Sequence, residues 1–220
     1  MKQLSVVLVL LLLPCAAGAQ EFWASGVIAN PTSRVSLNGT VQSTSGVWGG
    51  LEFGARLGRF RIRGVGTRGQ LTPSGSSAPL DREVGEMGGT VDYAVLSWLA
   101  AEAGYTARAF NSATGHQRWD IFGVGVHARQ TLGTPELEGF ARLSYLPVVD
   151  VSGQERPDLS YAAETGITLR PSNVPLLISV SYAIERFEFP GGTRVEQFER
   201  LTVSVGVLVS RIGGKWSLGG

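Results

Sequence analysis

The chain has 220 residues with 19 basic and 18 acidic side chains, which gives a formal net charge of +1. This balance argues against nucleic acid as a partner, because nucleic-acid-binding surfaces are strongly basic. Only 17% of the residues are charged, against about 25% in average soluble domains. After the N-terminal segment, no apolar stretch approaches the roughly 20 residues of a transmembrane helix, so a membrane location would require strands.

Residues 1–19 have the pattern of a cleaved export signal. Lys2 supplies a positive charge, Val6–Leu13 form an apolar core, and Ala17-Gly18-Ala19 provide the small residues of a cleavage site. The apolar core is too short to span a bilayer as a helix. The competing interpretation is a lipoprotein anchor at Cys15, which is disfavoured because a proline directly precedes the cysteine.

Residues 20–220 are expected to form one domain. This segment is long enough for a single domain with a substantial buried interior. Removal of the signal also removes the only cysteine, so the mature protein is expected to have no disulfide and no thiol chemistry.

Apolar residues fall on alternate positions in ten short segments of this domain. The last segment is the clearest, because Leu201, Val203, Val205, Val207 and Val209 alternate with small or polar residues. Successive side chains of a strand point to opposite faces, so each segment has one apolar and one polar face. The predicted strands cover residues 34–42, 46–57, 59–68, 86–98, 101–110, 118–130, 136–146, 159–170, 175–187 and 197–210. Most are close to the 9–11 residues, roughly, that a tilted strand needs to cross a bilayer.

Short and long connections alternate between these segments. Short links lie at 57–59, 98–101, 131–135 and 170–175, and longer ones at 70–85, 111–117, 147–158 and 188–196. Outer-membrane barrels place short turns in the periplasm and long loops outside. A chain that starts in the periplasm therefore has every long connection outside, with a short first outer loop at 43–45. The 70–85 loop is expected to be an ordinary solvated loop, and it is the surface that would contact a partner if there is one. All prolines are expected in the signal, the connections or the strand ends, because proline cannot donate to a strand ladder.

One face of the predicted strands carries six arginines and six acidic residues. If this face points into the barrel, the charges can neutralise one another as structural ion pairs, which removes most of the cost of burying them. The predicted lumen network consists of Glu52, Arg56, Arg61, Arg63, Asp92, Glu102, Arg108, Arg129, Glu138, Arg142, Glu164 and Glu185. The opposite face is uncharged near mid-strand; it begins with Val35 and Leu37 and ends with the valines of the last strand.

Periodicity alone does not decide which face is inside. With the charges outside, the apolar face would become the core of a soluble barrel similar to a lipocalin or avidin. Two features favour lipid against the apolar face instead. The charged face is rich in glycine, serine and threonine, unlike the usual exterior of a soluble protein, and the apolar face has few of the large residues that fill the centre of a small soluble barrel.

No catalytic, cofactor or metal site is predicted. His116 falls in a predicted outer loop and His127 on the inner face near the periplasmic end. Neither has a neighbour pattern specific for acyl-transfer or metal chemistry. Trp98 and Trp119 lie near predicted strand ends, where aromatic rings favour the membrane interface.

The pattern of alternating strands behind an export signal resembles the small outer-membrane β-barrel proteins of diderm (Gram-negative) bacteria, over essentially the whole chain after the signal. The resemblance implies an all-β, antiparallel up-and-down transmembrane barrel of about ten strands, with eight or twelve as alternatives. It also implies a location in outer-membrane lipid and insertion by the barrel assembly machinery. One departure is visible: the family's last strand usually ends the chain with an aromatic residue, whereas here the chain continues through Trp216 to Gly220.

The function expected from the sequence is that of a porin-like membrane protein without enzymatic activity or cofactor. Its lumen would be largely filled, because aqueous channels appear at about 16 strands, which leaves a structural or surface-contact role or a narrow pore. One alternative is a secreted soluble barrel that binds a small apolar ligand. Another is an outer-membrane enzyme that modifies lipid or peptide, which would depend on His116 or an acid at the rim.

Overall fold

The structure, a computed structural model, describes residues 20–74, 81–113, 115–192, 194–212 and 215–218. The predicted signal at 1–19 and residues 75–80 of the predicted 70–85 loop lie outside the described residues. The strands are β1 (Gln20–Leu37), β2 (Thr40–Leu57), β3 (Phe60–Pro73), β4 (Arg82–Ala94), β5 (Leu99–Ser112), β6 (Gly115–Leu132), β7 (Thr134–Val151), β8 (Leu159–Leu169), β9 (Leu176–Glu188), β10 (Arg194–Ile212) and β11 (Lys215–Leu218), with a 3-10 turn η1 (Pro190–Gly192) before β10. Within these ranges no helix is long and apolar enough to cross a membrane.

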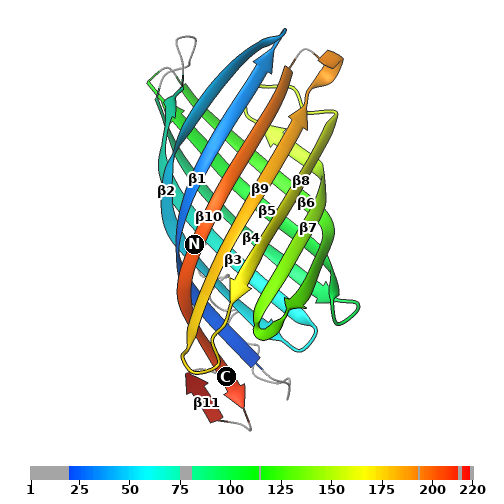
Figure 1. Ribbon diagram of the computed structural model, residues 1–220. Helices are drawn as coiled ribbons and strands as arrows, with labels where there is room; N and C mark the ends of the chain where they lie inside the picture. The colour runs from blue at the N-terminus through cyan, green and yellow to red at the C-terminus, as the bar shows by residue number, and fades with distance from the viewer. Residues whose placement is uncertain (1–19, 75–80, 114, 193, 213–214, 219–220) are drawn as a thin grey trace, which may run out of the picture.

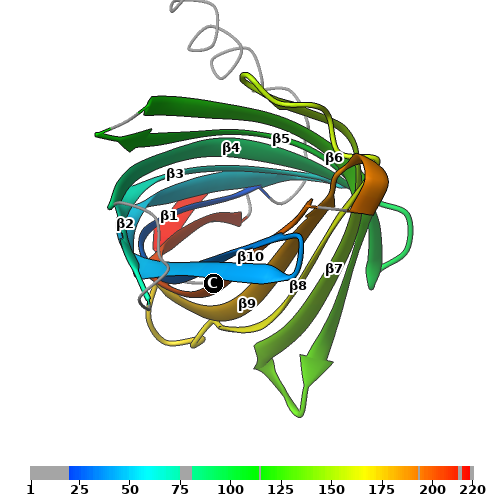
Figure 2. The same ribbon diagram turned by 90° about the horizontal axis from the view of Figure 1, so that it is seen from above.

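Strands β1 to β10 form a closed antiparallel barrel (Figure 1). Each strand pairs with the next one along the chain, and β1 closes the ring by pairing with β10 from Gln20–Arg211 to Leu37–Arg194. Viewed from above, the strands surround one interior (Figure 2). The predicted up-and-down barrel of about ten strands is thereby confirmed. We call the end where β1 begins and β10 ends proximal, and the opposite end distal.

The chain doubles back after β10. Strand β11 pairs with Val209–Ile212 of β10, just beyond Val207, where the pairing of β10 with β9 ends. At the proximal end β11 therefore takes the place beside β10 that β9 holds further up (Figure 1). Trp216, which the sequence placed beyond the last strand, lies in β11 opposite Arg211.

The first hairpin differs from the prediction. Its turn is Asn38-Gly39, with φ of 47° and 82°, so the predicted strand at 34–42 spans a turn and the predicted outer loop at 43–45 lies inside β2. Positive φ at both central residues is what a two-residue hairpin of type I′ requires, and Asn-Gly is its strongest sequence signal. Because the turn reverses the chain, Val35 and Leu37 belong to β1 and line the distal mouth of the barrel instead of facing lipid.

Several strands are longer than predicted and extend the barrel at its distal end. Strand β5 runs to Ser112 and β6 begins at Gly115, so the predicted long connection at 111–117 is a tight hairpin. Strand β7 continues to Val151, well into the predicted 147–158 loop. Strands of 18 residues such as β6 and β7 exceed the roughly 9–11 residues that cross a bilayer, so the barrel wall has a distal overhang.

Two prolines lie inside strands, contrary to the expectation from the sequence. Pro31 is in β1, where the ladder with β2 is interrupted between Ala29–Trp48 and Thr32–Ser45. Pro147 is in β7 beside a register shift between Phe122 and Val124 of β6. An interrupted or bulged ladder leaves backbone groups unpaired, so a residue without an N–H is tolerated there.

The outer face of the barrel has an apolar middle and a charged distal rim. At the rim, Arg34 lies 2.6 Å from Glu199, and Arg118 lies 2.9 Å from Asp120. Below Glu199, the outward side chains of β10 from Leu201 to Val207 are exposed and uncharged. Exposed, uncharged side chains in this position are what the apolar band of a membrane barrel requires.

Candidate functional site

The lumen carries the chain's buried charges. All twelve residues of the predicted lumen network occupy inward positions of the strands, on the same face as the buried residues Trp48, Asp92 and Arg142. The most exposed is Arg56 at the proximal rim, whose side chain is 44% exposed and 4.0 Å from Glu21. The structure distributes the twelve over distinct layers and does not join them into one network.

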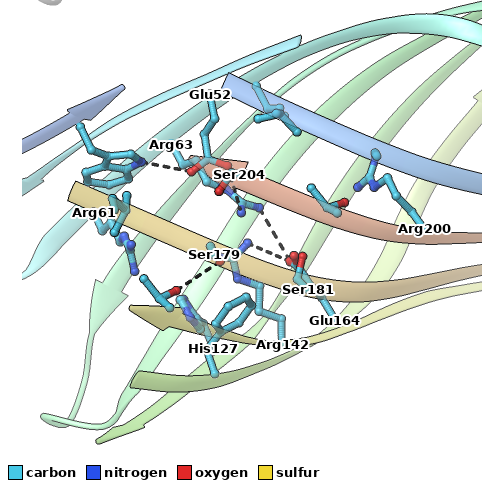
Figure 3. A pocket seen from close by; sticks show the side chains of 18 of the residues that line it. Glu52, Arg61, Arg63, His127, Arg142, Glu164, Ser179, Ser181, Arg200 and Ser204 are labelled. Atoms are coloured by element: carbon cyan, nitrogen blue, oxygen red, sulfur yellow. Dashed lines mark hydrogen bonds and ion pairs between the residues drawn. The ribbon is translucent and has the colours of Figure 1, made fainter. Parts of the chain in front are cut away.

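The proximal charged layer, which consists of Glu52, Arg63, Glu102, Arg142 and Glu164, is centred on Glu164. Arg142 lies 3.2 Å from Glu164 and 3.4 Å from Glu102. Arg63 lies 3.9 Å from Glu164 and 4.0 Å from Glu52. Figure 3 shows Arg63 and Arg142 converging on Glu164 from different strands. Each carboxylate of this layer thus has an arginine at ion-pair distance, which is the condition for burying such groups.

Two cavities border this layer. One, of about 80 Å³, is lined by Arg61, Ser179 and Ser204 among others (Figure 3). The other, of about 130 Å³, is lined by residues that include Thr90 and Leu146. Four charged residues line both cavities, namely Arg63, Arg142, Glu164 and Arg200. These side chains therefore lie between the two spaces and separate them.

The distal charged layer consists of Glu86, Arg108, Glu185 and Arg200. Arg108, only 2% exposed, contacts Glu86 at 2.6 Å and Glu185 at 2.8 Å. The other oxygen of Glu86 accepts a hydrogen bond of 2.6 Å from Arg200. Two arginines and two carboxylates thus balance one another in a continuous chain of charge-assisted hydrogen bonds, which are stronger than neutral ones.

Two members of this layer, Glu86 and Arg200, were not among the residues predicted from the sequence to line the lumen. Strand parity could have found both, because Glu86 lies an even number of residues before Asp92 and Arg200 an even number before Ser204. The contact between them could not be predicted from the sequence, because Glu86 lies on β4 and Arg200 on β10, and these strands are not adjacent in the barrel.

A third group contains the residues best suited to hold a metal. His127, 1% exposed, lies 2.8 Å from Asp92, and Asp92 is directly opposite Glu102 in the β4–β5 ladder. One ligand atom from each of the three lies within 4.8 Å of the others, a donor set of two oxygens and one nitrogen that suits a divalent transition metal. Arg142, however, already supplies positive charge 3.4 Å from Glu102. The group is thus continuous with the proximal charged layer.

The proximal end of the lumen is richer in arginine than in acid. Arg129 and Arg170 are among the positive charges that act on Arg61 there, and Glu138 is the acid that opposes them. At the rim itself, the hydroxyl and amide of Ser172 donate hydrogen bonds of 2.6 and 2.9 Å to Glu136. These bonds favour the ionised carboxylate and hold the pKa of Glu136 below its usual range.

The distal part of the lumen contains an apolar plug. Its largest members are Trp48, with no exposed surface, and Trp119, 2% exposed. Trp48 packs on Phe198 with ring centroids 5.3 Å apart, and Trp119 packs edge-on against Phe187 at 4.9 Å. The plug, defined by contact among buried apolar side chains, comprises Ala29, Trp48, Leu71, Val84, Phe110, Trp119, Ile121, Leu146, Val149, Val151, Phe187, Phe189 and Phe198.

The plug corrects one prediction from the sequence. Trp119 was expected at the membrane interface but points into the lumen and is buried, whereas Trp98, in the β4–β5 turn, is 53% exposed. Both tryptophans lie near strand ends, and parity distinguishes them: Trp119 shares its face with His127 on β6. Arg108 connects the plug to the distal charged layer, because its guanidinium lies 4.2 Å from the ring centre of Phe198.

A cleft of about 350 Å³ opens at the distal mouth, lined by residues that include Val35, His116 and Glu196. His116 belongs to β6 and not to a long loop, and its ring Nδ1 is hydrogen-bonded to Asn111. Asp120, the nearest acid to His116 along β6, is engaged by Arg118 and by the Tyr105 hydroxyl. Burial raises the pKa of Glu196, against the opposing effect of the adjacent Arg194.

Comparisons with known proteins identify the architecture. No protein-family model and no curated protein matches the chain. Among solved structures, the outer membrane protease OmpT from Escherichia coli aligns with a TM-score of 0.51 at 11% identity, covering 89% of this chain and 97% of that one. The chain has the fold of an outer-membrane β-barrel. At this identity the likeness shows the fold alone.

Two further barrels align at lower TM-scores. Neisserial surface protein A gives 0.40 at 16% identity, covering 84% of this chain and 96% of that one. The translocator domain of the autotransporter NalP from Neisseria meningitidis gives 0.40 at 10% identity, covering 84% and 88%.

Proposed function

We propose that the protein is an outer-membrane β-barrel with a closed interior, which has a structural or surface-contact role and does not act as a diffusion channel. The observation that carries this proposal is the apolar plug, in which Trp48 and Trp119 are almost completely buried. The two charged layers below it add a second obstruction to the passage of solutes. A barrel of ten strands is also well below the roughly 16 strands at which aqueous channels appear.

The outer face supports a membrane location. Large apolar side chains such as Leu51 and Met87 are 67% and 70% exposed, whereas Arg108 and Glu86 are enclosed in the lumen. A soluble barrel that binds an apolar ligand would need the opposite arrangement. Export and insertion by the barrel assembly machinery belong to the same proposal.

Cell fractionation tests the location. Outer-membrane material is run on a denaturing gel with and without boiling, and we expect detergent-dependent extraction and a shift in mobility on heating. A detergent-independent protein without that shift would contradict the membrane proposal.

Planar-bilayer recording tests the closed interior. The natural protein is expected to give no stable large conductance, and Trp48→Ala combined with Phe198→Ala is expected to increase the frequency of small openings because it removes the centre of the plug. Trp98→Ala is the matched control, since Trp98 lies outside the lumen. A stable, large conductance of the natural protein would overturn the proposal.

A further inference from the structure

The arginine cluster at the proximal end of the lumen, defined as Arg61, Arg129 and Arg170, is incompletely neutralised. The charged groups that act most strongly on Arg61 are three arginines, Arg129, Arg142 and Arg170, and one acid, Glu138. Within the part of the chain that the structure describes, Arg170 has Glu138 at 3.8 Å, but neither Arg61 nor Arg129 forms an ion pair within 4.0 Å. Guanidinium groups that are taken out of water without counter-charges destabilise a fold, so an anion bound to them would relieve that cost.

The cluster contains donors that have no acceptor among the described residues. The Nε atoms of Arg129 and Arg170 are buried and have no acceptor among the described residues. The guanidinium of Arg61 lies 4.8 Å from the ring centre of Trp23. Stacking on a ring fixes the plane of a guanidinium and leaves the N–H groups at its edge available for an acceptor.

Trp23, which supports Arg61, is itself held in place. Its indole N–H donates a 3.1 Å hydrogen bond to Glu52, and its ring lies across Gly54, where a Cβ atom would come within 2.0 Å of the indole. Only a residue without a side chain lets the ring occupy this position. Arg61 therefore stacks on a tryptophan ring whose own position is fixed.

The surroundings suit a small anion. The cavity of about 80 Å³ that adjoins Arg61 and Glu138 is lined by hydroxyl groups that include Ser179 and Ser181, with Arg61 towards one end and Arg200 towards the other (Figure 3). Two further carboxylates of its lining, Glu52 and Glu164, are paired with arginines of the proximal charged layer. The side chains of Arg170 and Glu138 are 23% and 26% exposed, so ions can reach the cluster. Arg108 in the distal charged layer is only 2% exposed and has two carboxylate partners, which is what a purely structural arginine requires.

We propose that the proximal arginine cluster binds a small oxyanion, a phosphate or carboxylate group that enters from the proximal end of the barrel. Guanidinium groups bind such groups through paired, charge-assisted hydrogen bonds. Among the described residues Arg61 and Arg129 have no carboxylate at ion-pair distance, so their donors can bind the anion, while Glu138 limits the affinity by repelling it.

Titration calorimetry of the whole chain folded in detergent tests this inference, with inorganic phosphate in one arm and acetate or citrate in the other, at constant ionic strength. The two arms distinguish a phosphate ligand from a carboxylate ligand. We expect saturable binding of one of them, weakened about tenfold or more by Arg61→Gln and by Arg129→Gln, because each removes a charge-assisted hydrogen bond. Glu138→Gln is expected to strengthen binding, which no loss of folding can imitate.

Arg194→Gln is the matched control. Arg194 is an inward arginine at the distal end that is already paired with Glu196, so its loss should leave anion binding unchanged. Each variant is first checked for the heat-dependent mobility shift of a folded barrel. Absence of saturable binding in the natural protein, equal effects of the Arg61 and Arg194 substitutions, or weaker binding by Glu138→Gln would each overturn the proposal.

Discussion

The apolar plug and the distal charged layer fill neighbouring parts of the same lumen by opposite chemistry. In the plug, Trp48 and Phe198 exclude water by volume and ring packing. One layer below, Glu86, Arg108 and Glu185 exclude it by mutual charge neutralisation. Phe198 belongs to the plug and also contacts Arg108, so the change from one chemistry to the other occurs across a single side chain.

This difference shows what a membrane barrel demands of each face. The outer face must be uncharged where it meets lipid, because a charge there has no partner. The inner face has no such requirement, since any filling that is well packed or well paired is acceptable. Inward side chains can therefore be either polar or apolar, and the alternation of polar and apolar residues along a strand is lost where the apolar plug lies.

Loss of volume in the plug should give the largest effect. Trp48→Ala removes a fully buried ring and is expected to lower the free energy of unfolding by about 3–5 kcal/mol. Urea unfolding in lipid vesicles, followed by the mobility shift on gels, measures this. Trp48→Phe keeps a ring and removes an indole N–H that has no acceptor among the described residues, so it should cost much less. Equal losses for the two variants would mean that volume does not hold the plug together.

A charge on the outer face should come next. Val205, 50% exposed on the outward side of β10, lies in the uncharged band, and Val205→Arg is expected to cost about 2–4 kcal/mol. Thr202→Arg places the same charge at an inward position that lines the cavity beside Glu164. The same unfolding assay should give a smaller loss for Thr202→Arg. Equal tolerance of the two substitutions would count against the assignment of the faces.

Loss of charge without loss of volume should give the smallest effect. Glu86→Gln leaves Arg200 without its 2.6 Å carboxylate partner and weakens the bond from Arg108, with an expected cost of about 1.5–3 kcal/mol. Glu83→Gln is the matched control, because Glu83 pairs with Arg68 on the exposed surface, where ion pairs contribute roughly 0–1 kcal/mol. Indistinguishable unfolding curves for these two variants would show that the distal charged layer is not held by charge.

The strands were predictable where one face is uniformly apolar. The final strand was predicted at 197–210 and is observed as β10 at Arg194–Ile212, because its valines alternate without interruption. The prediction of the first strand was wrong, because the segment from Val35 to Val41 contains Asn38-Gly39, a strong hairpin signal that turns the chain there. The distal overhang was not predicted for a different reason. Val149 and Val151 are apolar side chains that face the plug, so in this part of β7 the inward face is not the polar one.

The sequence by itself determined the up-and-down barrel and the parity of the charged residues, because a period of two is a local property of each strand. Only the tertiary structure decided which charges meet. Glu86 contacts Arg200 across 114 positions of sequence, and that distance is closed by barrel curvature, not by pairing of neighbouring strands. The same closure buries Trp119 and leaves Arg61 and Arg129 without ion-pair partners among the described residues, because what fills a lumen depends on side chains that converge from all sides of the ring.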